Sequence, residues 1–130
     1  MAAWRTGSLL AGAVLATALL AVVLAAPTAD ARRRTPATTV GVGAREYRFA
    51  EYRASVPRGV VRFDLTNYGE DGHDLVVETR GGRGLGRTGK VGSGRRAVLQ
   101  LHLAPGTYRL VCDLADHEAR GMHTTLRVTR

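Results

Sequence analysis

Three side chains near the end of the sequence are of types that ligate soft metal ions, and they are regularly spaced. Cys112, His117 and Met122 follow one another as Cys-x4-His-x4-Met. The segment begins at the end of one predicted strand and finishes at the start of the next. A loop of that size can turn all three side chains toward one point, and Gly121 eases the backbone just before the methionine.

A fourth donor is available from an upstream turn. Residues 67–75 read Asn-Tyr-Gly-Glu-Asp-Gly-His-Asp-Leu, which places His73 where a loop enters a strand. Two imidazoles, one thiolate and a thioether are soft to borderline ligands, and a trigonal His2Cys set with a weak axial Met is typical of a blue copper electron-transfer site. The sequence therefore predicts one copper ion held by four residues: His73, Cys112, His117 and Met122.

Other polar residues near these positions have different predicted roles. Asp74 and Asp113 each directly follow a predicted ligand, and we expect them to form hydrogen bonds that tie the two ligand loops together. His102 lies opposite the leucines of a predicted strand, and His123 follows the methionine. Neither histidine fits the ligand pattern, and we expect both to be exposed.

Cys112 is the only cysteine in the chain, and this narrows the chemistry. A single thiol excludes an internal disulfide, a four-Cys zinc site and an iron–sulfur cluster held by this chain alone. A two-copper centre would need a second cysteine in the loop. Copper oxidases and nitrite reductases need additional copper centres, with histidines beside the cysteine or shared between domains. Here Val111 and Asp113 flank Cys112, so the His-Cys-His arrangement is absent. A lone cysteine is usually an inert, buried small residue, but in an exported protein metal ligation protects a thiol from oxidation. Because the residues for a further copper centre are missing beside Cys112, we predict that the protein is not an enzyme.

Short strands separated by turns must position these residues. β-Branched residues and period-two alternation dominate after residue 37, and no helical periodicity extends beyond a turn or two. Seven or eight short strands in about 90 residues favour an all-β, Greek-key sandwich. The clearest candidates are residues 38–42, 45–49, 60–66, 74–79, 97–103, 108–112 and 124–129.

The segment from Thr79 to Gly94 interrupts this spacing. It holds seven glycines and four basic residues, which favours a long mobile surface connection. It lacks the glycine and lysine spacing of a phosphate-binding loop.

The stretch from about residue 38 to residue 130 resembles the cupredoxin family, the plastocyanin and azurin type of small blue copper proteins. The family's Asn-x-Gly turn, followed by a histidine and an apolar strand, is matched by residues 67–77. Its Gly-x-Tyr-x-x-x-Cys strand is matched by residues 106–112. The Cys-x4-His-x4-Met spacing resembles the rusticyanin and auracyanin-like branches more than plastocyanin.

The resemblance implies a one-electron carrier that cycles between Cu(I) and Cu(II). It implies that Cys112 is the strong thiolate ligand, that His73 and His117 complete a trigonal plane, and that His117 is also the electron port. It further implies that Met122 is the weak axial ligand that tunes the potential. The family often has Pro-Gly before the second histidine, whereas this chain has Ala-Asp at residues 115–116. The alternative is a copper storage or delivery protein with the same ligands but no redox-shuttle role.

The first part of the chain has the layout of a secretory signal. Leu9–Ala26 is an uncharged apolar run preceded by an arginine, and Ala29–Ala31 gives a small-residue cleavage pattern. We predict a signal peptide at residues 1–31, with an uncleaved membrane anchor as the alternative. A basic leader at 32–37 and a cupredoxin domain at 38–130 follow. The sequence thus predicts an exported protein, periplasmic or extracellular.

The chain carries 19 basic and 11 acidic residues, a formal net charge of +8. This charge can attract an acidic redox partner protein, or an anionic membrane or cell-wall surface. Nucleic acid is not expected, because no stacking aromatic residues accompany the basic ones. With 45% hydrophobic and 23% charged residues, the composition also excludes a long disordered polar protein and a polytopic membrane protein.

Overall fold

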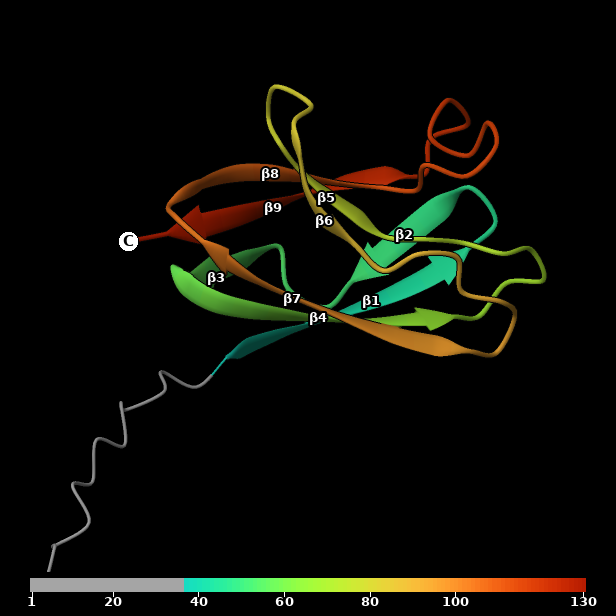
Figure 1. Ribbon diagram of the computed structural model, residues 1–130, viewed down its shortest axis with the longest axis horizontal. Helices are drawn as coiled ribbons and strands as arrows, with labels where there is room; N and C mark the ends of the chain where they lie inside the picture. Colours follow the sequence, from blue (N-terminus) through green and yellow to red (C-terminus); the bar gives the residue numbers. More distant parts are fainter. Residues whose placement is uncertain (1–36) are drawn as a thin grey trace, which may run out of the picture. The chain divides into compact units, whose positions relative to one another are not determined.

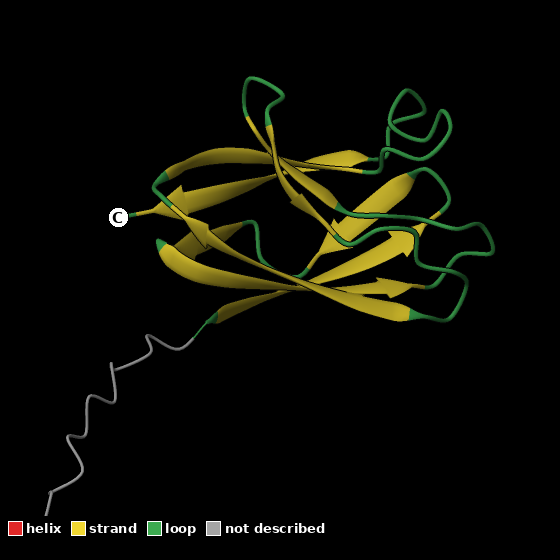
Figure 2. Cartoon of the chain, viewed as in Figure 1, coloured by secondary structure: helices red, strands yellow, loops and turns green. Residues whose placement is uncertain are grey.

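The computed structural model describes residues 37–130, which form two β-sheets packed against each other (Figure 1). All regular structure in this range is strand, as Figure 2 shows. No helix within it is long and apolar enough to cross a membrane. The predicted signal peptide, and all but the last residue of the predicted basic leader, lie outside the described residues.

The first sheet has four strands in the order β2-β1-β4-β7. β1 pairs with β2 in antiparallel fashion and with β4 in parallel fashion, and β4 pairs antiparallel with β7. The strands span β1 Thr38–Arg45, β2 Arg48–Glu51, β4 Gly59–Asn67 and β7 Arg96–Leu103.

The second sheet has five strands in the order β3-β9-β8-β5-β6. β3 runs parallel to β9, and the other neighbours are antiparallel. The strands span β3 Ser55–Pro57, β5 Val76–Thr79, β6 Gly84–Arg87, β8 Gly106–Val111 and β9 His123–Thr129. The chain repeatedly changes sheet along its length, which is the connectivity expected of a Greek-key sandwich.

Period-two alternation builds the core between the sheets. In β4, Val61, Phe63 and Leu65 are fully buried, whereas Arg62 and Asp64 point outward and form an ion pair at 2.8 Å. Because alternate side chains of a strand leave opposite faces, such a pattern fixes which face meets the core. The same pattern in β1 and β9 completes one apolar cluster, which also contains Cys112 and Met122.

Residues 37–130 form nine strands, against seven or eight predicted. The short strand β3 was not predicted, and the predicted strand at 45–49 is displaced, because residues 46–47 form the turn before β2. The larger difference is β6, which lies inside the glycine-rich segment.

The prediction of a long mobile connection is therefore wrong for the central part of the glycine-rich segment. A Cβ atom on Gly86 would lie 2.9 Å from a methyl carbon of Leu101 and 3.2 Å from one of Leu99, so this glycine allows close packing of β6 against β7. Further along, Val91 is buried and pairs with His73 in an isolated antiparallel bridge. Composition alone does not distinguish glycines that permit close packing from glycines that permit motion.

Candidate metal centre

Three of the four predicted ligands meet at one end of the sandwich. The potential donor atoms of His73, Cys112 and His117 all lie within 4.8 Å of one another. The two histidine Nδ1 atoms are 3.2 Å apart, and Cys112 Sγ lies 3.5 Å from His117 Nδ1. His73 and Cys112 are fully buried, and His117 is 7% exposed.

Met122 is fully buried beside this cluster, and its backbone joins the two ends of the loop. Cys112 directly follows β8, and Met122 directly precedes β9. The Cys112 N–H donates to the Met122 carbonyl at 3.1 Å, and the Met122 N–H donates to the His117 carbonyl at 2.9 Å. The φ angles of Gly121 (103°) and Ala115 (50°) are both positive, which gives this short loop its tight turns.

The loop that carries His73 is held by one buried amide. The Asn67 side chain donates to the carbonyls of Asp71 at 2.7 Å and Val91 at 2.9 Å, and its Oδ1 accepts from the Gly69 N–H at 2.8 Å. His73 also exchanges two backbone hydrogen bonds with Val91, at 3.0 and 2.7 Å. The Asn-x-Gly turn marked this position in the sequence, but it did not reveal the role of the Asn67 side chain.

Asp74 links the two ligand loops, as predicted. Its backbone N–H points at Cys112 Sγ at 3.5 Å, and its Oδ1 accepts from the Asp113 N–H at 2.8 Å. This carboxylate is fully buried. A buried charge requires a partner, and Arg87 supplies one, at 2.5 Å from Asp74 Oδ2 and 3.2 Å from Asp113 Oδ2.

The role of Arg87 was not predicted, because it belongs to β6 in the glycine-rich segment. Its hydrogen bond with Asp74, more than any other cause, raises the pKa of the guanidinium. No spacing rule connects residue 87 with residue 74. Only the antiparallel pairing of β5 with β6 brings the two side chains together.

A tyrosine from the β1–β2 turn covers His117. The Tyr47 ring meets the imidazole edge to face, with centroids 5.5 Å apart, and the Arg120 guanidinium carbon lies 4.5 Å from the Tyr47 ring centroid. Arg120 also pairs with Asp116 at 2.7 Å, and this hydrogen bond lowers the pKa of the carboxyl group. Tyr47 has φ +60°, an uncommon value for a bulky residue. We call Tyr47 and Arg120 the cap of His117.

Burial disfavours the charged forms of two of these side chains, His73 and Cys112. Burial, and then the charge of His117, lower the pKa of His73, while burial raises the pKa of the Cys112 thiol. His73 Nε2 is buried without a hydrogen-bond partner among residues 37–130. Two ring nitrogens and one sulfur therefore face one another in a buried place, each able to donate a lone pair to a cation. This donor set fits a soft or borderline cation, whose binding would displace the thiol proton.

The remaining histidines lie where the sequence placed them. His102 is exposed on β7, and His123 is exposed at the start of β9, next to Met122. The structure therefore separates the four histidines into two buried ones that meet and two exposed ones that do not.

The β-sandwich and the cluster together define a small β-domain with a buried His-Cys-His group between two loops.

No protein-family model matches the sequence, and no curated protein matches it closely. Solved structures do match. Auracyanin B is 27% identical over 74% of this chain and 91% of its own, with a TM-score of 0.67. Auracyanin A of Chloroflexus aurantiacus, a "blue" copper protein, is 15% identical over 72% and 100%, with a TM-score of 0.63. Reduced rusticyanin is 20% identical over 70% and 77%, with a TM-score of 0.57.

These neighbours are cupredoxins, and the chain has the cupredoxin fold. The resemblance to the cupredoxin family is confirmed, and auracyanins and a rusticyanin are among the similar structures.

Proposed function

We propose that this protein holds one type 1 copper ion and acts as an exported one-electron carrier. The observation that carries the proposal is the buried convergence of His73, Cys112 and His117, whose donor atoms lie within 4.8 Å of one another. The similarity to auracyanin A, a "blue" copper protein, supports copper as the metal. Bound copper would supply the one-electron chemistry, because it has two stable oxidation states.

The protein's part is to hold the ligands in one arrangement. Cys112 would bind as a thiolate, His73 and His117 through their ring nitrogens, and Met122 more weakly through its thioether. The hydrogen bonds of Asn67 and the Asp74 bridge fix the two loops. Ligands that are held in place before copper binds move little when the copper changes its oxidation state. A small rearrangement favours fast electron transfer.

His117 is the proposed electron port, because it is the one histidine of the cluster with measurable exposure, at 7%. A redox partner that exchanges electrons through this ring would dock beside Tyr47, which packs on it.

A carrier fits the site better than an enzyme does. The neighbours are electron-transfer proteins of the blue copper type. Val111 and Asp113 flank Cys112, so the cysteine has no adjacent histidine that could bind a further copper ion. A storage or delivery protein would need a site from which copper exchanges readily. The burial of Cys112 and the cap over His117 disfavour that alternative.

The proposals about export and about binding partners rest on the sequence alone. The predicted signal peptide at residues 1–31 supports a periplasmic or extracellular location, and a retained anchor would keep the domain at the membrane. The net charge of +8 supports an acidic redox partner or an anionic membrane or cell-wall surface.

The test is the visible spectrum of the protein after addition of Cu(II), for wild type and for Cys112→Ser. We expect an intense thiolate-to-copper band in wild type that is absent from the variant, and a reversible one-electron wave in voltammetry. Absence of the band from both proteins would contradict the type 1 site. A band with no reversible wave and rapid loss of copper to a chelator would favour storage or delivery.

A further inference from the structure

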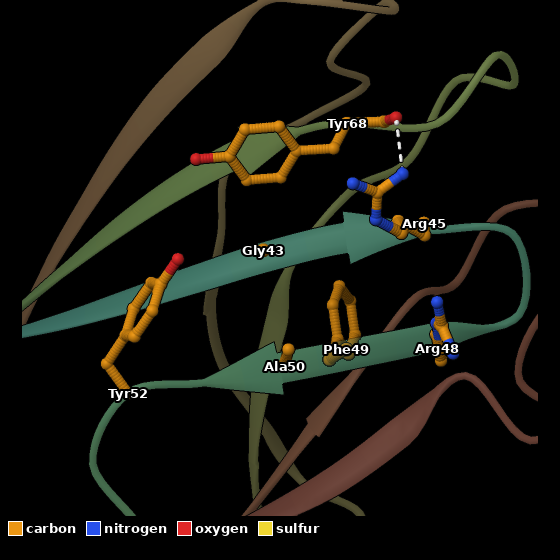
Figure 3. Close-up of a pocket in the computed structure, with 7 residues that line it drawn as sticks. All are labelled: Gly43, Arg45, Arg48, Phe49, Ala50, Tyr52 and Tyr68. Carbon is orange, nitrogen blue, oxygen red and sulfur yellow. Dashed lines mark hydrogen bonds between the residues drawn. The ribbon is translucent and has the colours of Figure 1, made fainter.

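The outer face of the β1–β2 hairpin carries a groove of about 490 Å³. Figure 3 shows Tyr52 and Tyr68 on either side of Gly43, with Arg45 and Arg48 at the end of the hairpin nearest its turn. The two tyrosines are 76% and 49% exposed. We call these five residues the arginine–tyrosine groove.

Glycines on β1 leave room for the tyrosine rings. A Cβ atom on Gly41 would lie 2.5 Å from a ring carbon of Tyr52, and one on Gly43 would lie 3.4 Å from the ring of Tyr68. Neither glycine has a positive φ, so neither is required by backbone conformation. Their absent side chains keep the floor of the groove open between two aromatic walls.

The arginines in the groove break a rule of sheet stability. Arg45 and Arg48 stand directly opposite each other in the β1–β2 ladder, and like charges at such positions are destabilising. Neither takes part in an ion pair among residues 37–130, whereas Arg62, Arg87 and Arg109 do. A pair of like charges that weakens a sheet is expected mainly at a functional site, where binding requires it.

Arg45 already has partners that orient it. Its Nη1 donates to the Tyr68 carbonyl at 3.4 Å, and its guanidinium carbon lies 5.6 Å from the Tyr68 ring centroid. Neither contact is with a carboxylate. Arginines at directly opposite positions of the ladder can both reach the oxygens of one carboxylate, and the adjacent rings offer apolar surface.

The groove adjoins the electron port. Arg45 and Arg48 flank the two-residue turn that carries Tyr47, and Tyr47 packs on His117. A molecule bound at the two arginines would therefore lie beside the cap. The walls of the groove enclose a protruding side chain better than they would lie against a flat lipid surface.

We propose that the arginine–tyrosine groove binds an acidic segment of the protein that exchanges electrons with this one. A carboxylate of the partner pairs with Arg45 and Arg48, and a neighbouring apolar side chain packs between Tyr52 and Tyr68. This inference rests on the proposed electron-carrier function and names the part of the surface that recognises the partner.

The test is an NMR titration of the ¹⁵N-labelled protein, metal-free and copper(I)-loaded, with a hexapeptide of alternating glutamate and phenylalanine. We expect the amide signals of Gly43, Arg45, Arg48 and Tyr68 to shift most. The double variant Arg45→Gln/Arg48→Gln should weaken binding at least tenfold. It should leave the visible copper band and the midpoint potential unchanged.

The matched control is Arg80→Gln/Arg83→Gln, which removes the same charge from the exposed β5–β6 turn. Equal weakening by this control would overturn the proposal, since net charge alone would then explain binding. A second control is the hexapeptide with glutamine in place of each glutamate, and equally tight binding of this peptide would also overturn the proposal. Equally tight binding of inorganic phosphate or of phosphatidylglycerol vesicles through the same arginines would overturn it as well. Because peptide binding is measured on the metal-free protein too, its outcome is separate from that of the copper spectrum.

Discussion

The two loops that supply the ligands are built on different principles. The loop carrying His73 is fastened from inside by side chains, namely the buried Asn67 amide and the buried Asp74 carboxylate. The loop from Cys112 to Met122 is closed by its own backbone, and Tyr47 from the β1–β2 turn packs on it from outside, in contact with His117 and with Arg120 of the same loop. The first loop thus fixes the site, while the second carries His117, the least buried of the predicted ligands.

The largest effect on stability is expected from Asn67→Ala. This change removes three hydrogen bonds. It leaves the buried Gly69 N–H and the Asp71 carbonyl without this partner, while the Val91 carbonyl keeps only the His73 N–H. We expect a loss of about 2 to 3 kcal/mol in the free energy of unfolding, measured by urea denaturation of the metal-free protein. Asp116→Ala, in the other loop, is the control and should have a much smaller effect, because its ion pair with Arg120 is exposed. Equal losses would show that the two loops are not held differently.

The next effect is on the reduction potential and follows from the charges around Cys112. Asp74→Asn removes a buried negative charge that favours Cu(II), so we expect the potential to rise. Arg87→Gln removes the compensating positive charge, so we expect the potential to fall. The shift should be smaller for Arg87, since its side chain is 51% exposed and therefore screened by solvent. Voltammetry of both variants checks this, and shifts of the same sign would contradict the assigned role of the ion pair.

The cap can be tested without copper. In the metal-free protein, Tyr47→Ala should speed the modification of His117 by diethylpyrocarbonate several-fold, because the ring that covers the imidazole is gone. Tyr47→Phe keeps the ring and should behave like wild type, and Tyr52→Ala serves as the distant control on the same hairpin. If Tyr47→Ala reacts at the wild-type rate, the tyrosine does not limit access to the port.

The smallest effect is a pH dependence of the metal-free fold. Burial depresses the pKa of His73 in the folded state below its unfolded value of about 6.5. Its contribution to stability is therefore fully present above that value and is lost as the pH falls through the folded pKa. We expect the melting temperature of the wild type to fall more than that of His73→Gln between pH 7.5 and pH 5.5. Parallel curves would show that His73 does not contribute to the acid sensitivity.

The two loops also differ in how readily their ligands can be predicted from the sequence. The cysteine loop is local, and the spacing of Cys112, His117 and Met122 was sufficient to indicate a site. The partner loop was found because His73 follows a recognisable turn. Strand alternation, as in Val61, Phe63 and Leu65, predicted the sandwich for the same local reason.

Long-range features could not be found in this way. Arg87 reaches Asp74 only through the pairing of β5 with β6, and the glycines around it indicated a mobile connection. Tyr47 reaches His117 across 70 positions in the chain, by way of a turn that the sequence placed inside a strand. Contacts of this kind depend on how the sheets pack, which periodicity does not encode.

A crystal structure of the copper-loaded protein would show the metal and its ligands directly. We predict a single copper ion bonded to Cys112 Sγ and to the Nδ1 atoms of His73 and His117, with Met122 as a further, weaker ligand. Copper bound elsewhere on the chain, or copper that leaves Cys112 uncoordinated, would contradict it.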